Sequence, residues 1–227
     1  MNKAHEYRDR ASLDRALAEH IAGLLREDIV LRGAASLAVS GGSTPRGMFA
    51  CLAVQPLPWD HVHITLVDER WVETDSPDSN EKLVRETLLQ GAAAAAHFTG
   101  LKSAHATADT GLPEISARLA NMPLPFTCVI LGMGNDGHTA SWFPRAANLQ
   151  QLLDMNSDQL LGTCDPVTAP LQRMTLTLPA VLNAREIILH ITGDEKRAVL
   201  ARAADENFPV AAITEQHVNP VSIWWAP

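Results

Sequence analysis

Positive charge is scarce in this sequence of 227 residues, which has 18 lysines and arginines against 26 aspartates and glutamates and a formal net charge of −8. The basic residues form no Lys/Arg-rich block, so the sequence lacks the electrostatic footprint of a nucleic-acid binder. Its first residues, MNKAHEYRDRASLDRALAEH, are charged throughout, and no long apolar run follows them. These absences predict neither a signal peptide nor a membrane span, and we expect a cytoplasmic protein without nucleic-acid or membrane partners.

Cysteine is rarer still, with three residues. Cys51, Cys128 and Cys164 lie far apart and form no CxxC pair, which predicts reduced thiols and no zinc site. The histidines lack HxxxH spacing and the carboxylates lack a calcium-loop pattern, so we expect neither a metal nor another cofactor. A GxSxG nucleophile elbow and a GxxxxGK[ST] nucleotide loop are also absent, which argues against a serine hydrolase of that type and against a P-loop protein.

What remains has the composition of a globular protein, with 46% apolar and 19% charged residues. Short apolar runs rich in β-branched residues predict strands buried on both faces, at residues 36–39, 62–67, 126–131 and 187–191. Between and before them, we expect helices at residues 12–32, 45–52, 79–89, 112–121 and 194–203. This alternation predicts a doubly wound α/β fold: a mainly parallel, Rossmann-like sheet with helices on both faces, in a single domain over residues 1–227.

Polar and glycine-rich loops follow each predicted strand, at residues 40–45, 68–70, 132–139 and 192–196. The carboxyl ends of parallel strands share one edge of a sheet, so we expect these loops to converge on one crevice. Residues 132–137 also fit GxGxxG. The acidic residues about 20 positions later, Asp154 and Asp158, lie in a polar, Gln-rich segment and do not end a second strand, which makes a dinucleotide site a weak alternative.

The residue types in these loops suit an anionic substrate. Gly41, Gly42, Ser43 and Thr44 would bring backbone N–H groups to a phosphate or carboxylate, although tight turns without a ligand remain an alternative. Lys196 stands at a helix start, where a cation is unfavourable unless an anion lies beside it. Arg70 and Arg173 add guanidinium groups suited to phosphate, and surface salt bridges are their alternative.

Asp136 and His138 place a carboxylate and an imidazole two residues apart at a predicted loop-to-helix junction. A positioned histidine is the commonest general base near neutral pH. A surface or capping histidine is the alternative.

Several segments, in order along most of the chain, resemble the 6-phosphogluconolactonase family: SGGSTP at 40–45, VDER at 67–70 followed by SN at 79–80, LGMGNDGHTASWFP at 131–144, RMTLTLPAVLNAR at 173–185 and ITGDEK at 191–196. GHTAS with its Phe-Pro ending is the most specific. Trp142 departs from the family, which more often has a smaller aliphatic residue there, and we interpret it as a packing change. The resemblance implies a Rossmann-like fold shared with sugar-phosphate isomerases, and a metal-free lactone hydrolase of the oxidative pentose phosphate pathway.

By this resemblance, the substrate is 6-phospho-D-glucono-1,5-lactone and the product is 6-phospho-D-gluconate. We hypothesise that His138 takes a proton from the attacking water, that Asp136 sets its orientation or charge, and that Asp68 is the next candidate base. Phosphate binding is predicted for Lys196, Arg70 and Arg173, with loop donors from Gly41, Gly42, Ser43 and Thr44.

Two other functions remain open from the sequence. A glucosamine-6-phosphate deaminase/isomerase resembles the chain in several loops, but it has a tyrosine where Arg70 stands and an acidic residue just before the proline that corresponds to Pro144. A non-catalytic sugar-phosphate sensor would need an effector module, and no basic recognition helix follows Lys196. We expect a monomer and a last buried strand at residues 223–225; a homodimer, with these residues in a contact surface, is the alternative.

Overall fold

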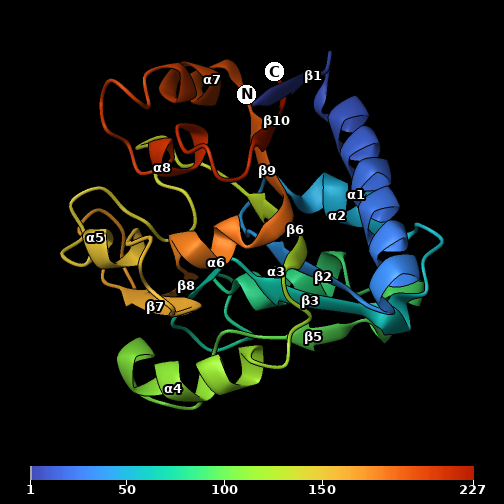
Figure 1. The fold of residues 1–227 in the computed structure, drawn as a ribbon, viewed down its shortest axis with the longest axis horizontal. Helices are drawn as coiled ribbons and strands as arrows, with labels where there is room; N and C mark the ends of the chain where they lie inside the picture. The colour runs from blue at the N-terminus through green and yellow to red at the C-terminus, as the bar shows by residue number, and fades with distance from the viewer. Residues whose placement is uncertain (1) are drawn as a thin grey trace.

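The computed structural model describes residues 2–227. Seven strands form a central sheet in the order β1-β10-β9-β6-β2-β3-β5, and every neighbouring pair is parallel (Figure 1). The strands are β1 (Lys3–Glu6), β2 (Ala35–Val39), β3 (Val62–Leu66), β5 (His97–Thr99), β6 (Phe126–Leu131), β9 (Ala184–Thr192) and β10 (Val221–Ala226). The predicted parallel α/β architecture is confirmed.

The central strands contain the apolar runs that predicted them. Every residue of β2 and β6 is buried, and the two strands pair in register from Leu37 with Cys128 to Val39 with Ile130. Residues 223–225 lie inside β10, as expected; Trp224 is buried, and Ile223 and Trp225 are partly buried. Because β10 also pairs with β1, the two ends of the chain lie side by side (Figure 1).

The first helix, α1 (Arg10–Arg32), begins two residues before the predicted start at residue 12 and ends at the predicted residue 32. The side chain of Asp9 accepts a hydrogen bond from the Ser12 N–H at 2.7 Å, and Gly33 ends the helix in the left-handed conformation, with φ of 81°. Asp28, which is wholly buried, accepts a hydrogen bond from Thr127 of β6 and pairs with Arg185 of β9. This carboxylate therefore fastens α1 to two strands of the sheet.

Helices cover both faces of the sheet, as β9 shows. Glu186 points toward α1 and lies 2.8 Å from His20. Ile191 points to the other face, where it lines an apolar groove together with Leu200 of α7 (Asp194–Ala201). The remaining helices are α2 (Arg46–Ala53), α3 (Asn80–Thr87), α4 (Ala108–Leu119), α5 (Leu149–Leu152), α6 (Leu178–Leu182) and α8 (Ala211–Thr214), with short 3-10 turns at Trp59–His61 and Gly91–Ala95.

A second, three-stranded antiparallel sheet was not expected. It has the order β4-β8-β7, from β4 (Asp68–Arg70), β8 (Arg173–Leu176) and β7 (Leu161–Cys164). The prediction of a loop over residues 68–70 is therefore wrong. Three charged residues give no apolar run, and their strand exists because it pairs with a distant segment, Asp68 with Thr175 and Arg70 with Arg173.

Trp142 is wholly buried and donates a hydrogen bond from Nε1 to the Leu176 carbonyl oxygen at 2.9 Å. The ring thus packs inside the molecule against β8; that it replaces a smaller residue of the family stays a prediction. No helix within residues 2–227 is long and apolar enough to cross a membrane.

Candidate active site

A cavity of about 250 Å³ opens at the carboxyl ends of β2, β6 and β9. All four segments predicted as loops contribute to its wall, although residues 68–70 are a strand, so their expected convergence is confirmed. The residues that line it are Ser40, Gly41, Gly42, Ser43, Thr44, Pro45, Asp68, Arg70, Asn80, Ile130, Leu131, Gly132, Met133, Gly134, His138, Ala140, His190 and Lys196.

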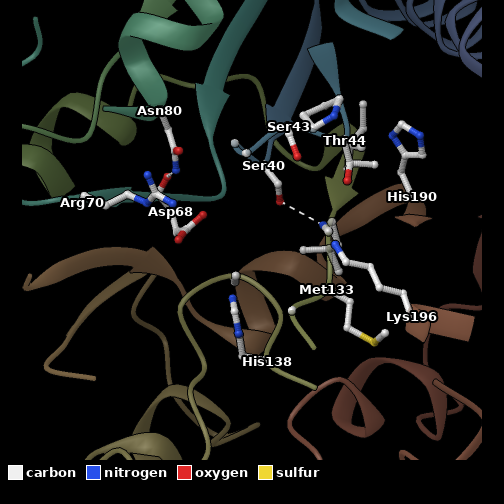
Figure 2. A pocket seen from close by; sticks show the side chains of 18 residues that line it. Ser40, Ser43, Thr44, Asp68, Arg70, Asn80, Met133, His138, His190 and Lys196 are labelled. Carbon is white, nitrogen blue, oxygen red and sulfur yellow. Dashed lines mark hydrogen bonds between the residues drawn. The ribbon is translucent and has the colours of Figure 1, made fainter. Parts of the chain in front are cut away.

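The glycine loop after β2 requires its glycines. A Cβ atom on Gly41 would lie 1.8 Å from the Asn80 side-chain oxygen, and Gly42 has φ of +90°. Ser40 joins this loop to the next one, because its Oγ accepts a hydrogen bond from the Gly132 N–H at 3.2 Å (Figure 2). No side chain caps the first turn of α2, whose N-cap is Pro45. The loop therefore leads into a helix start that keeps backbone donors for an anion.

His138 reaches the cavity from a tight loop. The Gly134 N–H donates to the His138 carbonyl oxygen at 2.9 Å, and the Gly137 N–H donates to the Gly134 carbonyl oxygen at 3.1 Å. Gly137 has φ of +75°, and a Cβ atom there would lie 2.4 Å from the Phe208 ring. Only glycine suits that position without strain, so the sequence fixes the bend that turns His138 inward.

Asp136 holds one ring nitrogen of His138. Its Oδ1 lies 2.5 Å from Nδ1. Burial alone would raise the pKa of Asp136, but the hydrogen bond and the charge of His138 outweigh it, and the pKa is lowered. A charged carboxylate only accepts hydrogen bonds, so Nδ1 carries the proton and Nε2 is the nitrogen free to accept one.

Asp68 and Arg70 line the same side of the cavity, because they are alternate residues of β4. The Asp68 carboxylate accepts a hydrogen bond from the Ser141 hydroxyl at 2.5 Å, and the Asp68 carbonyl oxygen accepts one from the Asn80 side chain at 2.8 Å. Arg70 donates from Nη1 to the Asp78 carbonyl oxygen at 2.6 Å. The buried Glu69 between them points away and accepts from the backbone N–H of Asn80 and of Glu81.

Lys196 lies on the other side of the cavity and extends from the first turn of α7 into it, while His138 points into the space between (Figure 2). Burial, and then the nearby charge of Arg10, lower the pKa of Lys196. Within residues 2–227 its ammonium group has no ion pair or side-chain hydrogen bond. The cavity thus carries one cation at each side.

Sequence reasoning missed three polar residues. Ser141 and Asn80 fix Asp68 in place, and His190 lines the cavity beside Lys196 (Figure 2). His190 is 2% exposed, and its pKa is lowered to about 4 by burial and then by the charge of Lys196. Its position within an apolar strand gave no functional signal. The only signal for Ser141 and Asn80 was their place in the family segments.

Two predicted residues do not line the cavity. Asp136 stands behind His138, as its predicted orienting role requires. Arg173 is buried in β8, and the centre of its guanidinium lies 5.7 Å from the centroid of the Phe143 ring. Its predicted contact with phosphate remains a prediction, since the cavity wall does not include it.

No group of three or more His, Cys, Asp or Glu side chains within residues 2–227 is arranged to hold a metal ion. The carboxyl-end cavity, with its glycine loop, flanking cations and His–Asp pair, defines an α/β protein of the kind that handles small anionic ligands.

The chain belongs to a known family. A family model described as "Glucosamine-6-phosphate isomerases/6-phosphogluconolactonase" matches residues 8–224. A 6-phosphogluconolactonase of Mesorhizobium japonicum is 43% identical over 221 residues, 96% of this chain and 93% of the relative. A 6-phosphogluconolactonase of Rhizobium meliloti is 40% identical over 227 residues, 98% of each chain.

Among solved structures, a 6-phosphogluconolactonase from Shewanella baltica OS155 superimposes with a TM-score of 0.97 at 43% identity, over 100% of this chain and 98% of that one. The resemblance to 6-phosphogluconolactonases that the loop segments suggested is confirmed.

Proposed function

We propose that this protein hydrolyses 6-phospho-D-glucono-1,5-lactone to 6-phospho-D-gluconate, as a metal-free enzyme of the oxidative pentose phosphate pathway. The observation that carries the proposal is the pairing of His138 Nδ1 with Asp136 at 2.5 Å, inside a cavity that also contains Lys196 and Arg70. The relatives named above, which are 40–43% identical, are 6-phosphogluconolactonases, and this supports the choice of substrate.

In the proposed reaction, His138 Nε2 takes a proton from water as the water oxygen attacks the lactone carbonyl carbon. The bond from that carbon to the ring oxygen then breaks, and the proton returns to the ring oxygen as it becomes a hydroxyl group. One water molecule is consumed and a carboxylic acid is formed. General-base catalysis of this kind contributes roughly 10²–10⁴ in rate.

Asp136 stabilises the imidazolium that forms during this step, because its carboxylate already accepts the Nδ1 hydrogen. Asp68 is the second candidate for the base. Its carboxylate lines the cavity but is held by the Ser141 hydroxyl, so it is less free to accept a proton from water.

The substrate phosphate is assigned to Lys196 and Arg70, together with backbone and hydroxyl donors of residues 41–44. A dianion needs several charge-assisted hydrogen bonds, each worth roughly 1.5–3 kcal/mol. Lys196 is the strongest support, because this half-buried cation lines the cavity without an ion pair or side-chain hydrogen bond among the described residues, and an anion would supply the missing partner. The net charge of −8 makes this attraction local to the cavity.

The test is proton release after addition of freshly prepared 6-phosphogluconolactone, with chelator present throughout. Unphosphorylated gluconolactone and glucosamine 6-phosphate serve as parallel substrates. Rapid, chelator-resistant hydrolysis of the phosphorylated lactone, well above the other two, is expected. A rate equal to the spontaneous one would overturn the proposal, and ammonia released from glucosamine 6-phosphate would favour a deaminase instead.

A further inference from the structure

Arg173 presents an energetic problem that the proposed function leaves open. It is 6% exposed, and its Nε and Nη1 atoms are buried without a hydrogen-bond partner. No ion pair of its guanidinium occurs within the described chain. Buried charges of this kind are costly unless something compensates for them, so the position calls for a physical explanation.

The aromatic ring of Phe143 contacts both Arg173 and His138. The centre of the Arg173 guanidinium lies 5.7 Å from the ring centroid, within the range of a cation–π interaction. The His138 ring stacks on Phe143 with centroids 4.2 Å apart and an interplanar angle of 25°. A continuous contact therefore runs from Arg173 through Phe143 to His138.

Strand β8 also fastens the segment that carries Phe143. The Ser141 N–H donates to the Thr175 hydroxyl at 3.2 Å, and Trp142 Nε1 donates to the Leu176 carbonyl oxygen at 2.9 Å. Arg173 begins the same strand. The strand thus holds the Ser141 backbone and the Trp142 side chain by hydrogen bonds and places a flat cation over the Phe143 ring.

We propose that Arg173 is a positioning residue, which holds Phe143 against the His138 ring, and that it does not bind the substrate phosphate. The inference rests on the proposed function, because it takes His138 to be the base. A planar, delocalised guanidinium suits this role better than an ammonium, since it stacks on an aromatic face and is more weakly hydrated. Nearby Asp68 partly offsets the burial of its charge.

The first test compares Arg173→Met with Arg70→Met on two substrates. Arg173→Met removes the planar charge but keeps a long unbranched side chain, and a misplaced base lowers kcat by about 10- to 100-fold. We expect the same factor with phosphorylated and unphosphorylated lactone, and an unchanged KM for the phosphorylated one. Arg70 lines the cavity, so Arg70→Met is expected to raise KM with the phosphorylated lactone alone. If Arg173→Met also raised KM with the phosphorylated lactone alone, the inference would be overturned.

A double-mutant cycle tests the route through Phe143. Phe143→Leu is expected to lower kcat in the same range, and adding Arg173→Met to it is expected to change kcat by less than about twofold, because coupled residues are not additive. Multiplied effects would show that Arg173 acts independently of Phe143. Arg173→Lys, which keeps charge without planarity, is expected to recover little activity.

Two measurements distinguish a positioning role of Arg173 from a general loss of folding or of activity. Thermal unfolding of each variant identifies any that fail to fold. The NMR resonances of the His138 ring report its stacking on Phe143 without any substrate, and Arg173→Met is expected to shift them toward values of an unstacked ring. Unchanged resonances in a folded Arg173→Met variant would overturn the inference. An inactive wild-type protein would instead overturn the proposed function.

Discussion

Asp136 and His138 form a pair in which the carboxylate Oδ1 lies 2.5 Å from the imidazole Nδ1, on a loop bent at Gly137. This contact determines which nitrogen carries the proton, and it selects the tautomer in which Nε2 can accept a proton, as the proposed role of His138 requires. The charge of Asp136 therefore determines which tautomer His138 adopts.

Substitution of either member should lower kcat. His138→Gln removes the base, and we expect kcat to fall about 10²–10⁴-fold with little change in KM. Asp136→Asn is expected to act similarly, because an amide N–H can donate to Nδ1 and leave the proton on Nε2. Steady-state kinetics with the phosphorylated lactone measures both. His217→Gln, at an exposed histidine, is the matched control and should retain full activity.

Asp68→Asn separates the two candidate bases. If His138 is the base, Asp68→Asn retains more activity than His138→Gln, because the amide preserves the shape of the side chain. A larger loss in Asp68→Asn, or full kcat in His138→Gln, would transfer the role to Asp68.

Lys196→Met should weaken binding of the phosphorylated lactone. The loss of one charge-assisted contact of roughly 1.5–3 kcal/mol raises KM about 10- to 150-fold. Hydrolysis of unphosphorylated gluconolactone, measured in parallel, should hardly change. Lys82→Met is the control, since the Lys82 ammonium donates to the Asp75 carbonyl oxygen and does not line the cavity. An unchanged KM in Lys196→Met would remove Lys196 from the phosphate site.

The sequence predicted the parts of the fold that depend on local patterns. Continuous apolar runs marked β2 and β6, because strands buried on both faces need them. Glycine-rich turns marked the loops of the cavity, because positions such as Gly42 and Gly137 have positive φ. These signals depend on a few neighbouring residues, so a single sequence contains them.

Features that depend on distant pairing could not be predicted. Arg70 and Arg173 are paired in neighbouring antiparallel strands, yet Arg70 lines the cavity and Arg173 is buried. Nothing in the residue type distinguishes them, and as directly paired residues they lie on the same face of the second sheet. The difference depends on the packing around each position, such as that of Phe143 against Arg173. The contact of Ser141 with Asp68 could not be predicted either, because it exists only after both sheets are in place.

Asp28 should be important for stability alone. It is wholly buried, bonds Thr127, and pairs with Arg185. Asp28→Ala leaves the Thr127 hydroxyl without its acceptor and removes the charge partner of the half-exposed Arg185, and the loss of such a buried acceptor costs about 1–3 kcal/mol. Urea unfolding of Asp28→Ala, with the exposed Asp60→Ala as control, measures the difference. A loss below about 1 kcal/mol would contradict the fastening role of Asp28.

His190 should make the folded state sensitive to acid. Burial, and then the charge of Lys196, lower its pKa to about 4 in the folded protein, against about 6.5 in an unfolded chain. Between these values the unfolded chain binds a proton that the folded one does not. The contribution of the neutral, buried His190 to the free energy of unfolding is therefore fully present above about pH 6.5. As the pH falls toward about 4, this group lowers the free energy of unfolding by at most about 3 kcal/mol.

The charged groups around His190 modify this dependence. Asp14 Oδ1 lies 3.9 Å from Nε2, and burial raises the pKa of Asp14, so its own contribution runs in the opposite direction. Arg10 lies near Lys196 and adds positive charge. Urea unfolding free energies measured from pH 7 to pH 4 should therefore fall less steeply in His190→Gln than in the wild-type protein, whereas His217→Gln should leave the slope unchanged. Equal slopes in His190→Gln and the wild-type protein would show that His190 titrates alike in both states and that its burial is not maintained in solution.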